Sequence, residues 1–207
     1  RPGVGVNLLR GQNNVHGSCD MGSFTHELPG YRHGSDPAVR ELFGGEWGVK
    51  IQPEPGLRIP NMFDAAVDGS FKALYVQGED IAQSDPDTQH VQKALESLEC
   101  LIVQDIFLNE TAKYAHVIFP GSSFLEKDGT FTNAERRISM VRKVMPPLAG
   151  LADWEVTVRF AEALGYRMDY SHPSEIMDEI ARLTPTFTGV SYDKIDKLGR
   201  RQRHPNS

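Results

Sequence analysis

The sequence predicts an α/β fold in which a parallel sheet is flanked by helices, followed by an irregular β-hairpin and a helical C-terminal part. Three segments of strand length, 71–76, 99–103 and 116–120, are separated by helix patterns. The second segment is an apolar run, as is typical of a parallel strand covered on both faces. The order β-α-β-α-β makes a right-handed parallel layer the simplest architecture.

The first third of the chain is predicted to be mostly loop. Residues 1–70 are rich in Gly, Pro, Asn and His and show no sustained periodicity, with short helices expected near 36–43 and 60–68. Segments this irregular usually wrap a ligand or a partner rather than form a core. We therefore interpret residues 1–70 as a loop-rich active-site segment.

Residues 71–123 are expected to hold the α/β layer. A helix is predicted to begin at Ser84, which can act as a cap residue and is followed by a proline in the first turn. Apolar residues over 91–98 recur at i, i+3, i+4 and i+7, so one face of this helix should be buried. A shorter helix is expected over 109–115.

Residues 124–207 are expected to form a hairpin and helices that pack on the layer. Turn residues and β-branched residues over 129–144 predict the irregular hairpin. One helix should be capped by Asp153, and another should span 174–183. The tail from about residue 199 has no apolar residues to bury and is expected to fray.

Composition excludes several functional classes. The chain has 207 residues, 39% of them hydrophobic, and no apolar run long enough for a membrane span. Its formal charge of −6 argues against nucleic acid as a partner. Two cysteines, Cys19 and Cys100, cannot form a disulfide framework, so a cytoplasmic location is expected. The start at Arg1, without Met or a signal peptide, suggests a segment of something longer. The charge clusters 126–128 and 136–137 are interpreted as solvated.

Polar and small residues follow each predicted strand. Ligands of open parallel sheets bind beyond the carboxyl ends of the strands. The residues at these ends are Gly78-Glu79-Asp80, Gln104-Asp105 and Gly121-Ser122-Ser123. Acidic side chains there can accept hydrogen bonds from a ribose, and Ser84 can hold a phosphate oxygen. The G-x-G-x-x-G fingerprint is absent, which disfavours a nicotinamide site. Acids at strand ends are also common as turn formers or caps.

Arg10 is a second candidate functional residue. A guanidinium matches a planar carboxylate because two parallel N–H donors meet both oxygens, and the amide of Gln12 adds neutral donors and acceptors. Composition alone would equally describe Arg10 as a surface residue in a turn. His16 and Cys19 have an H-x-x-C spacing, but a closed zinc site needs four ligands and no second pair lies nearby. We therefore assign no metal ligand in this chain.

Several segments together resemble the catalytic (alpha) subunits of molybdopterin-dependent formate dehydrogenases, in the molybdopterin oxidoreductase family. The likeness extends over nearly the whole chain. The matching stretches are Gly3-Val4-Gly5-Val6-Asn7, Arg10-Gly11-Gln12-Asn13-Asn14-Val15, Cys19-Asp20-Met21-Gly22, Gly78-Glu79-Asp80, Ile102-Val103-Gln104-Asp105-Ile106-Phe107, Val117-Ile118-Phe119-Pro120, Glu126-Lys127-Asp128-Gly129-Thr130-Phe131-Thr132-Asn133 and Asp153-Trp154. Each stretch is weak alone, but their order and spacing are specific.

The resemblance implies a pair of pyranopterin guanine dinucleotides that chelate molybdenum or tungsten, with formate oxidised to carbon dioxide and electrons leaving through an iron–sulfur cluster. It implies that Arg10 and Gln12 line the formate site. It also implies that 71–123 is the dinucleotide-binding layer. The residues implied to contact one dinucleotide are Gly78, Glu79, Asp80, Ser84, Val103, Gln104, Asp105 and Asp153. Position 121 is Gly where many relatives have Ser, so a cofactor contact there is in doubt.

The sequence also departs from the family pattern. The ligands of a [4Fe–4S] cluster, the Cys or selenocysteine that binds the metal, and the C-terminal cofactor domain are all missing. We therefore expect this polypeptide alone to be inactive and to work with the remainder of a catalytic subunit and with electron-transfer subunits. Two alternatives remain open: a non-catalytic nucleotide-binding or assembly module, and a related molybdopterin oxidoreductase such as a nitrate reductase.

Overall fold

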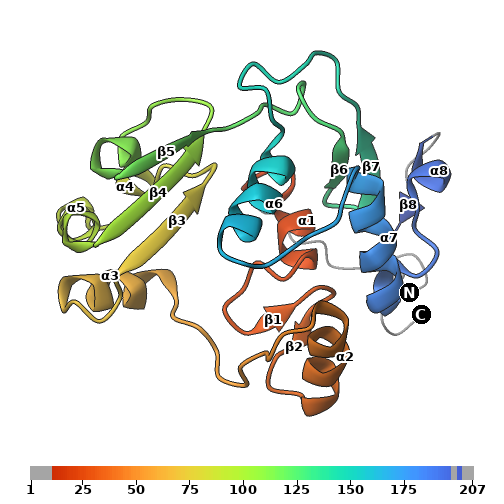
Figure 1. Ribbon diagram of the computed structural model, residues 1–207, viewed down its shortest axis with the longest axis horizontal. Coiled ribbons are helices and arrows are strands. Elements are labelled where there is room, and N and C mark those ends of the chain that lie inside the picture. Colours follow the sequence, from red (N-terminus) through yellow and green to blue (C-terminus); the bar gives the residue numbers. More distant parts are fainter. Residues whose placement is uncertain (1–10, 197–199, 202–207) are drawn as a thin grey trace, which may run out of the picture. The chain divides into compact units, whose positions relative to one another are not determined.

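The computed structural model describes residues 11–196 and 200–201 (Figure 1). The chain forms two compact units, and each is assembled from segments that are separate in the sequence. Of the described residues, the sheet unit comprises 57–127 and 143–168, and the hairpin unit comprises 11–56, 128–142, 169–196 and 200–201. None of the helices in the described residues is long and apolar enough to cross a membrane.

The sheet unit contains the predicted parallel sheet. Its strands are β3 (Ala73–Gln77), β4 (Cys100–Asp105) and β5 (Val117–Pro120), and they are ordered β3-β4-β5 with both pairs parallel. Gln77 is opposite Gln104, and Asp105 is opposite Pro120. The predicted α/β layer is therefore confirmed, and its strands end together at one edge of the sheet (Figure 1).

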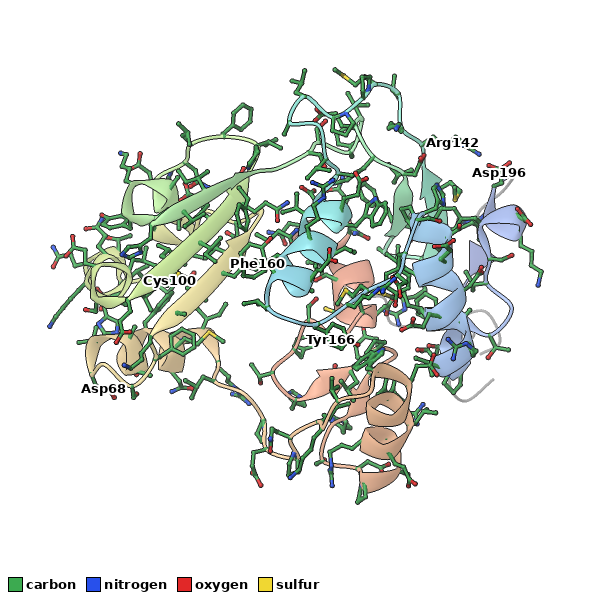
Figure 2. The ribbon with its side chains drawn as sticks, in the orientation of Figure 1. Asp68, Cys100, Arg142, Phe160, Tyr166 and Asp196 are labelled. Carbon is green, nitrogen blue, oxygen red and sulfur yellow. The ribbon has the colours of Figure 1, made fainter. Side chains whose placement is uncertain are left out.

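Helices cover this sheet on both faces. The helical segments of the unit are α3 (Ile59–Val67), α4 (Ile81–Ser84), α5 (Thr88–Ser97), the 3₁₀ helix η1 (Thr111–Tyr114) and α6 (Asp153–Ala163). Helices α3, α4 and α5 pack with the fully buried Leu101 and Val103 of β4 in one apolar core. Because side chains alternate along a strand, Gln104 faces the opposite side. There α6 packs Phe160 edge-on against Tyr75 and Phe119 (Figure 2).

Two predicted helix starts are wrong by a few residues. Ser84 ends α4, and α5 begins at Thr88 after Asp87, whose carboxylate accepts a hydrogen bond from the His90 amide at 3.3 Å. The proline at 86 explains the shift, because the residue before a proline is driven out of the helical region. Likewise Asp153 is the first residue of α6 and not its cap, since Ala152 takes that position.

The hairpin unit contains the predicted β-hairpin and short helices. Its elements are α1 (Val15–Asp20), β1 (Glu27–Leu28), β2 (Arg32–His33), α2 (Pro37–Trp47), β6 (Gly129–Thr132), β7 (Arg137–Val141), α7 (Pro173–Leu183), the 3₁₀ helix η2 (Pro185–Phe187), α8 (Tyr192–Ile195) and β8 (Arg200–Arg201). Strands β6 and β7 pair antiparallel, which confirms the hairpin. The backbone of Arg200 and Arg201 pairs with β7 as β8.

Arg136 was expected to be solvated, and the structure corrects this. It lies in the turn between β6 and β7 with a φ of 62°, a backbone conformation that residues other than glycine rarely adopt. Its guanidinium is 3.0 Å from the buried carboxylate of Asp20 and 3.2 Å from the hydroxyl of Tyr31. A buried charge is costly without a partner, so this ion pair fixes the hairpin turn to α1.

Candidate functional site

The carboxyl edge of the parallel sheet gathers the predicted site residues of the sheet unit. The turn after β3 begins at Gly78, whose φ of 65° lies in the left-handed region that glycine occupies without strain. The amide of Gly78 donates to the carbonyl of Gln104 at 2.9 Å and so holds this turn against β4. A Cβ at Gly78 would meet no atom within 4 Å, so the space beside the turn is open.

Asp80 is fully engaged by the chain itself. Its Oδ1 accepts from the amide of Thr111 at 2.9 Å and from the Thr111 hydroxyl at 2.7 Å. Its Oδ2 accepts from Gln83 at 2.7 Å and from the amide of Glu110 at 3.3 Å. A carboxylate offers about four lone-pair sites, so these four donors use its capacity. Burial alone would raise the pKa of Asp80, but the hydrogen bonds outweigh it and the pKa is lowered.

Glu79 and Asp105 keep free acceptor capacity. Glu79 is exposed and receives one hydrogen bond within the described residues, from the Ser84 hydroxyl at 2.6 Å. Asp105 receives one bond on each oxygen, from the Phe107 amide at 3.2 Å and from Asn109 at 3.0 Å. About two lone-pair sites of Asp105 and three of Glu79 therefore remain for a ligand. These two carboxylates are the predicted site residues best able to accept hydrogen bonds from a bound molecule.

Gln104 and Asp153 form one polar network behind the edge. Gln104 is 1% exposed, and its amide oxygen accepts from the hydroxyl of Tyr75 while its amide nitrogen donates to Asp153 at 2.9 Å. The same Asp153 oxygen accepts from the Ser122 amide at 2.8 Å, and its other oxygen pairs with Lys127. Buried polar groups are stable only when paired, so this network fixes the start of α6 beside the ends of β4 and β5.

Two other predicted contacts have restricted roles. Val103 is fully buried in the apolar core, so only its backbone can reach a ligand. Ser84 is exposed at the end of α4, where its hydroxyl donates to Glu79.

At Gly121 an added Cβ would lie 2.9 Å from the carbonyl carbon of Asp105, closer than real Cβ atoms come. A larger residue at 121 would therefore push β5 away from β4.

The charged segment 126–128 was expected to be solvated, and this interpretation is wrong for two of its residues. Glu126 is 6% exposed and accepts hydrogen bonds from the amides of Ser123 and Leu148, both at 2.7 Å. These bonds hold the pKa of Glu126 below its usual value. Lys127 pairs with Asp153 and donates to the Ser122 carbonyl at 2.8 Å. Sequence reasoning missed Lys127 because its partner lies 26 residues away.

An apolar pocket of about 280 Å³ lies between β5 and α6. Its walls include Phe119, Pro120 and Phe160, and Arg159 is its one charged residue. The strand-end carboxylates are not among its lining residues. We therefore place the candidate polar site at the strand ends and not in this pocket.

Gln12, one of the two residues predicted to line the formate site, lies in the hairpin unit. Gln12 is exposed in the turn that leads into α1, and its carbonyl accepts from the Val15 amide at 3.4 Å. Arg10 lies outside the described residues. His16 and Cys19 are both buried, and the His16 ring lies 3.3 Å from the guanidinium of Arg136.

Comparison with known proteins places these features in context. The molybdopterin oxidoreductase family pattern matches residues 1–163. The F420-dependent formate dehydrogenase subunit alpha of Methanocaldococcus jannaschii is 46% identical over 198 residues, which are 94% of this chain and 29% of that protein. A relative from Staphylococcus haemolyticus is 46% identical over 196 residues, which are 94% of this chain and 20% of the relative. The chain thus spans less than a third of the length of either relative.

A solved structure has the same fold. Acetylene hydratase from Pelobacter acetylenicus superposes with a TM-score of 0.61 over 83% of this chain and 25% of that chain. The two sequences are 16% identical, so this likeness concerns the fold alone.

Proposed function

Because this chain belongs to the molybdopterin oxidoreductase family, we propose that it forms part of the catalytic subunit of a formate dehydrogenase. The relative from Methanocaldococcus jannaschii, named a formate dehydrogenase subunit, supports the choice of substrate through 46% identity across almost the whole chain. The observation that carries the proposal is the row of acceptors at the carboxyl edge of the sheet, where Glu79 and Asp105 keep lone pairs for a ligand.

The residues at this edge fit the guanine end of a pterin dinucleotide. Guanine presents N–H donors at N1 and N2 along one edge, and a ribose presents two hydroxyl donors. Two ionised carboxylates with free lone pairs complement such donors, and hydrogen bonds to charged acceptors are the stronger ones. We therefore assign ligand contact to Glu79 and Asp105. Asp80 and Asp153 position the backbone around them, together with Gly78, Ser84, Val103 and Gln104.

The neighbouring elements keep this acceptor edge in place. The Gln104 amide orients Asp153, and Lys127 compensates the Asp153 charge, so the start of α6 stays fixed when a ligand binds. When bound, a molybdenum or tungsten bis-pterin group supplies the redox chemistry by which formate becomes carbon dioxide. The protein supplies binding and orientation.

Arg10 is proposed to hold the formate carboxylate, with Gln12 beside it. The warrant is the match of the Arg10-Gly11-Gln12-Asn13-Asn14 run to the family motif, together with the fit of a guanidinium to a carboxylate. A lysine at this position would retain the charge but lose the paired donors.

Activity is proposed to need more than this polypeptide. A [4Fe–4S] cluster takes four cysteine ligands, and this sequence has two cysteines. We therefore propose that the cluster and the metal ligand come from the remainder of the catalytic subunit, and that further subunits accept the electrons. Because two cysteines are too few for a disulfide framework, we also propose a cytoplasmic location.

The test is made on the full-length protein that carries this sequence. Purified protein should contain a pterin cofactor and reduce an artificial electron acceptor when formate is added. Replacement of Arg10 by Lys should raise the KM for formate at least about tenfold while the pterin content stays unchanged. Cofactor binding without formate oxidation would favour a non-catalytic module, and activity with nitrate in place of formate would favour the nitrate reductase alternative. Either result would overturn the proposal.

A further inference from the structure

The short hairpin β1–β2 in the hairpin unit brings together three potential metal ligands. Its turn contains Gly30 with a φ of 79° and Tyr31 with a φ of 60°, and the Gly30 amide donates to the carbonyl of Asp20 at 2.7 Å. The turn sets the register so that Glu27 is directly opposite His33. The Gly34 amide bonds to the carbonyl of His26 at 3.0 Å, which extends the pairing by one residue.

The three side chains come close together at the open end of this hairpin. One ligand atom from each of His26, Glu27 and His33 lies within 4.8 Å of the other two. The His26 Nε2 atom is 3.7 Å from Glu27 Oε1. The two imidazole rings are nearly parallel, with centroids 5.5 Å apart and an angle of 11°. Two imidazoles thus flank one carboxylate on a backbone whose register is fixed.

One oxygen of the Glu27 carboxylate lacks a hydrogen-bond partner in the described residues. Its side chain is 12% exposed, and the Oε2 atom is buried without a hydrogen-bond partner in the described residues. A buried acceptor that is left unpaired destabilises the protein, and more so when it is charged. The two histidines are exposed, and His26 keeps 43% of its side-chain surface open. A cation bound between the rings and the carboxylate would neutralise the Glu27 charge and would be reachable from solvent through the exposed imidazoles.

We propose that His26, Glu27 and His33 bind a zinc ion. Two imidazoles and a carboxylate form a recognised three-ligand set for zinc, with water in the fourth position. Imidazole nitrogen favours zinc and its neighbours in the first transition row over magnesium and calcium, which prefer oxygen ligands. Tetrahedral ligands at 2.0–2.1 Å from zinc lie about 3.3 Å apart. The exposed imidazoles close the present spacing by side-chain rotation.

This site uses other residues than the proposed cofactor site. None of its ligands belongs to the residues assigned to the pterin dinucleotide or to formate, so either proposal can fail without the other. The sequence alone predicts no metal ligand, because the histidines are scattered along the chain. The hairpin turn, with its Pro29-Gly30 pair, brings His26 and His33 together across seven positions.

Zinc binding is measured on the full-length protein. Metal-depleted protein is titrated with zinc in competition with a chromophoric zinc chelator, and cobalt is used in parallel for its d–d absorption. We expect one equivalent of zinc that is lost or bound at least about tenfold more weakly in His26→Ala, His33→Ala and Glu27→Gln. The matched control is His90→Ala, which removes a histidine that pairs with a single carboxylate, Asp64, at 3.0 Å. This control should bind zinc like the wild type.

Hydrogen exchange of residues 26–34 separates folding from binding. In the wild type, zinc should slow exchange across the hairpin, and Glu27→Gln should exchange like the metal-free wild type with or without zinc. Equal zinc affinity in the wild type and His26→Ala would overturn the proposal. So would zinc that leaves exchange of the hairpin unchanged.

Discussion

Removal of the Asp80 carboxylate should open the junction between α4 and η1. The Thr111 hydroxyl donates to Asp80 and accepts from the Ala82 amide at 3.0 Å, so one buried side chain joins both elements. Thr111 is 0% exposed. In Asp80→Ala its amide and hydroxyl lose their acceptor, at about 1–3 kcal/mol each. The donors from Gln83 and Glu110 are exposed and return to water at little cost. We therefore expect a local loss of about 2–6 kcal/mol.

Hydrogen exchange of the full-length protein measures this loss locally. A free-energy change of about 1.4 kcal/mol is a factor of ten, so protection of the Ala82 and Thr111 amides should fall by roughly 30- to 20,000-fold. The matched control Glu99→Ala removes an exposed carboxylate paired with Lys72, and exposed pairs contribute little. Unchanged protection in Asp80→Ala would refute the assigned structural role of this carboxylate.

The effect should also depend on pH with a defined sign. The pKa of Asp80 is lowered in the folded protein, chiefly because hydrogen bonds from Thr111, Glu110 and Gln83 outweigh the opposing effect of burial. A group of this kind stabilises the fold above its unfolded pKa of about 3.9. This contribution is lost as the pH falls through the folded pKa. The difference between wild type and Asp80→Ala should therefore shrink in acid.

Three further outcomes are expected. Burial and the nearby Asp128 carboxylate raise the pKa of Tyr192 to about 12, so its neutral form stabilises the fold below pH 10.0 and this contribution is lost as the pH rises through 12. In an ultraviolet titration, the wild type should show a tyrosine that ionises at about pH 12, and Tyr192→Phe should lack it. Leu101→Ala, at a fully buried position, should destabilise the protein by about 2–5 kcal/mol in urea unfolding, whereas Leu148→Ala, 88% exposed, should have almost no effect. Gly121→Ala should lower the melting temperature because its Cβ would meet Asp105, whereas Gly129→Ala has open space and should not.

The parallel layer was predictable because its signals are local. The strands are short apolar segments, and the face of α5 that packs on them is visible as a helical repeat within one segment. The start of α5 was misplaced because Ser84 and Asp87 both suit a cap, and proline favours the later one. The two compact units were not visible in the sequence, because each is assembled from separated segments.

The carboxyl edge could be located from sequence, but the roles of its acids could not. Parallel strands end together, so a fixed rule placed Glu79, Asp80 and Asp105 near one another. Which of them keeps free lone pairs depends on donors distant in sequence, such as Thr111, 31 residues beyond Asp80. For the same reason Lys127 was interpreted as a solvated charge although it pairs with Asp153. Pairings of this kind leave no local pattern.

The most direct test of the central claim is the guanine nucleotide content of the full-length protein. The claim is that strand-end carboxylates with free acceptors hold the guanine end of the pterin cofactor. Nucleotide released by mild acid is measured per protein in wild type, in Asp105→Asn and in the control Glu99→Gln. Because Asp105 is assigned to one dinucleotide of the pair, we predict that the content falls toward half in Asp105→Asn, where a charge-assisted hydrogen bond of about 1.5–3 kcal/mol is lost, and stays unchanged in the control. Full nucleotide content in Asp105→Asn combined with Glu79→Gln would contradict the claim.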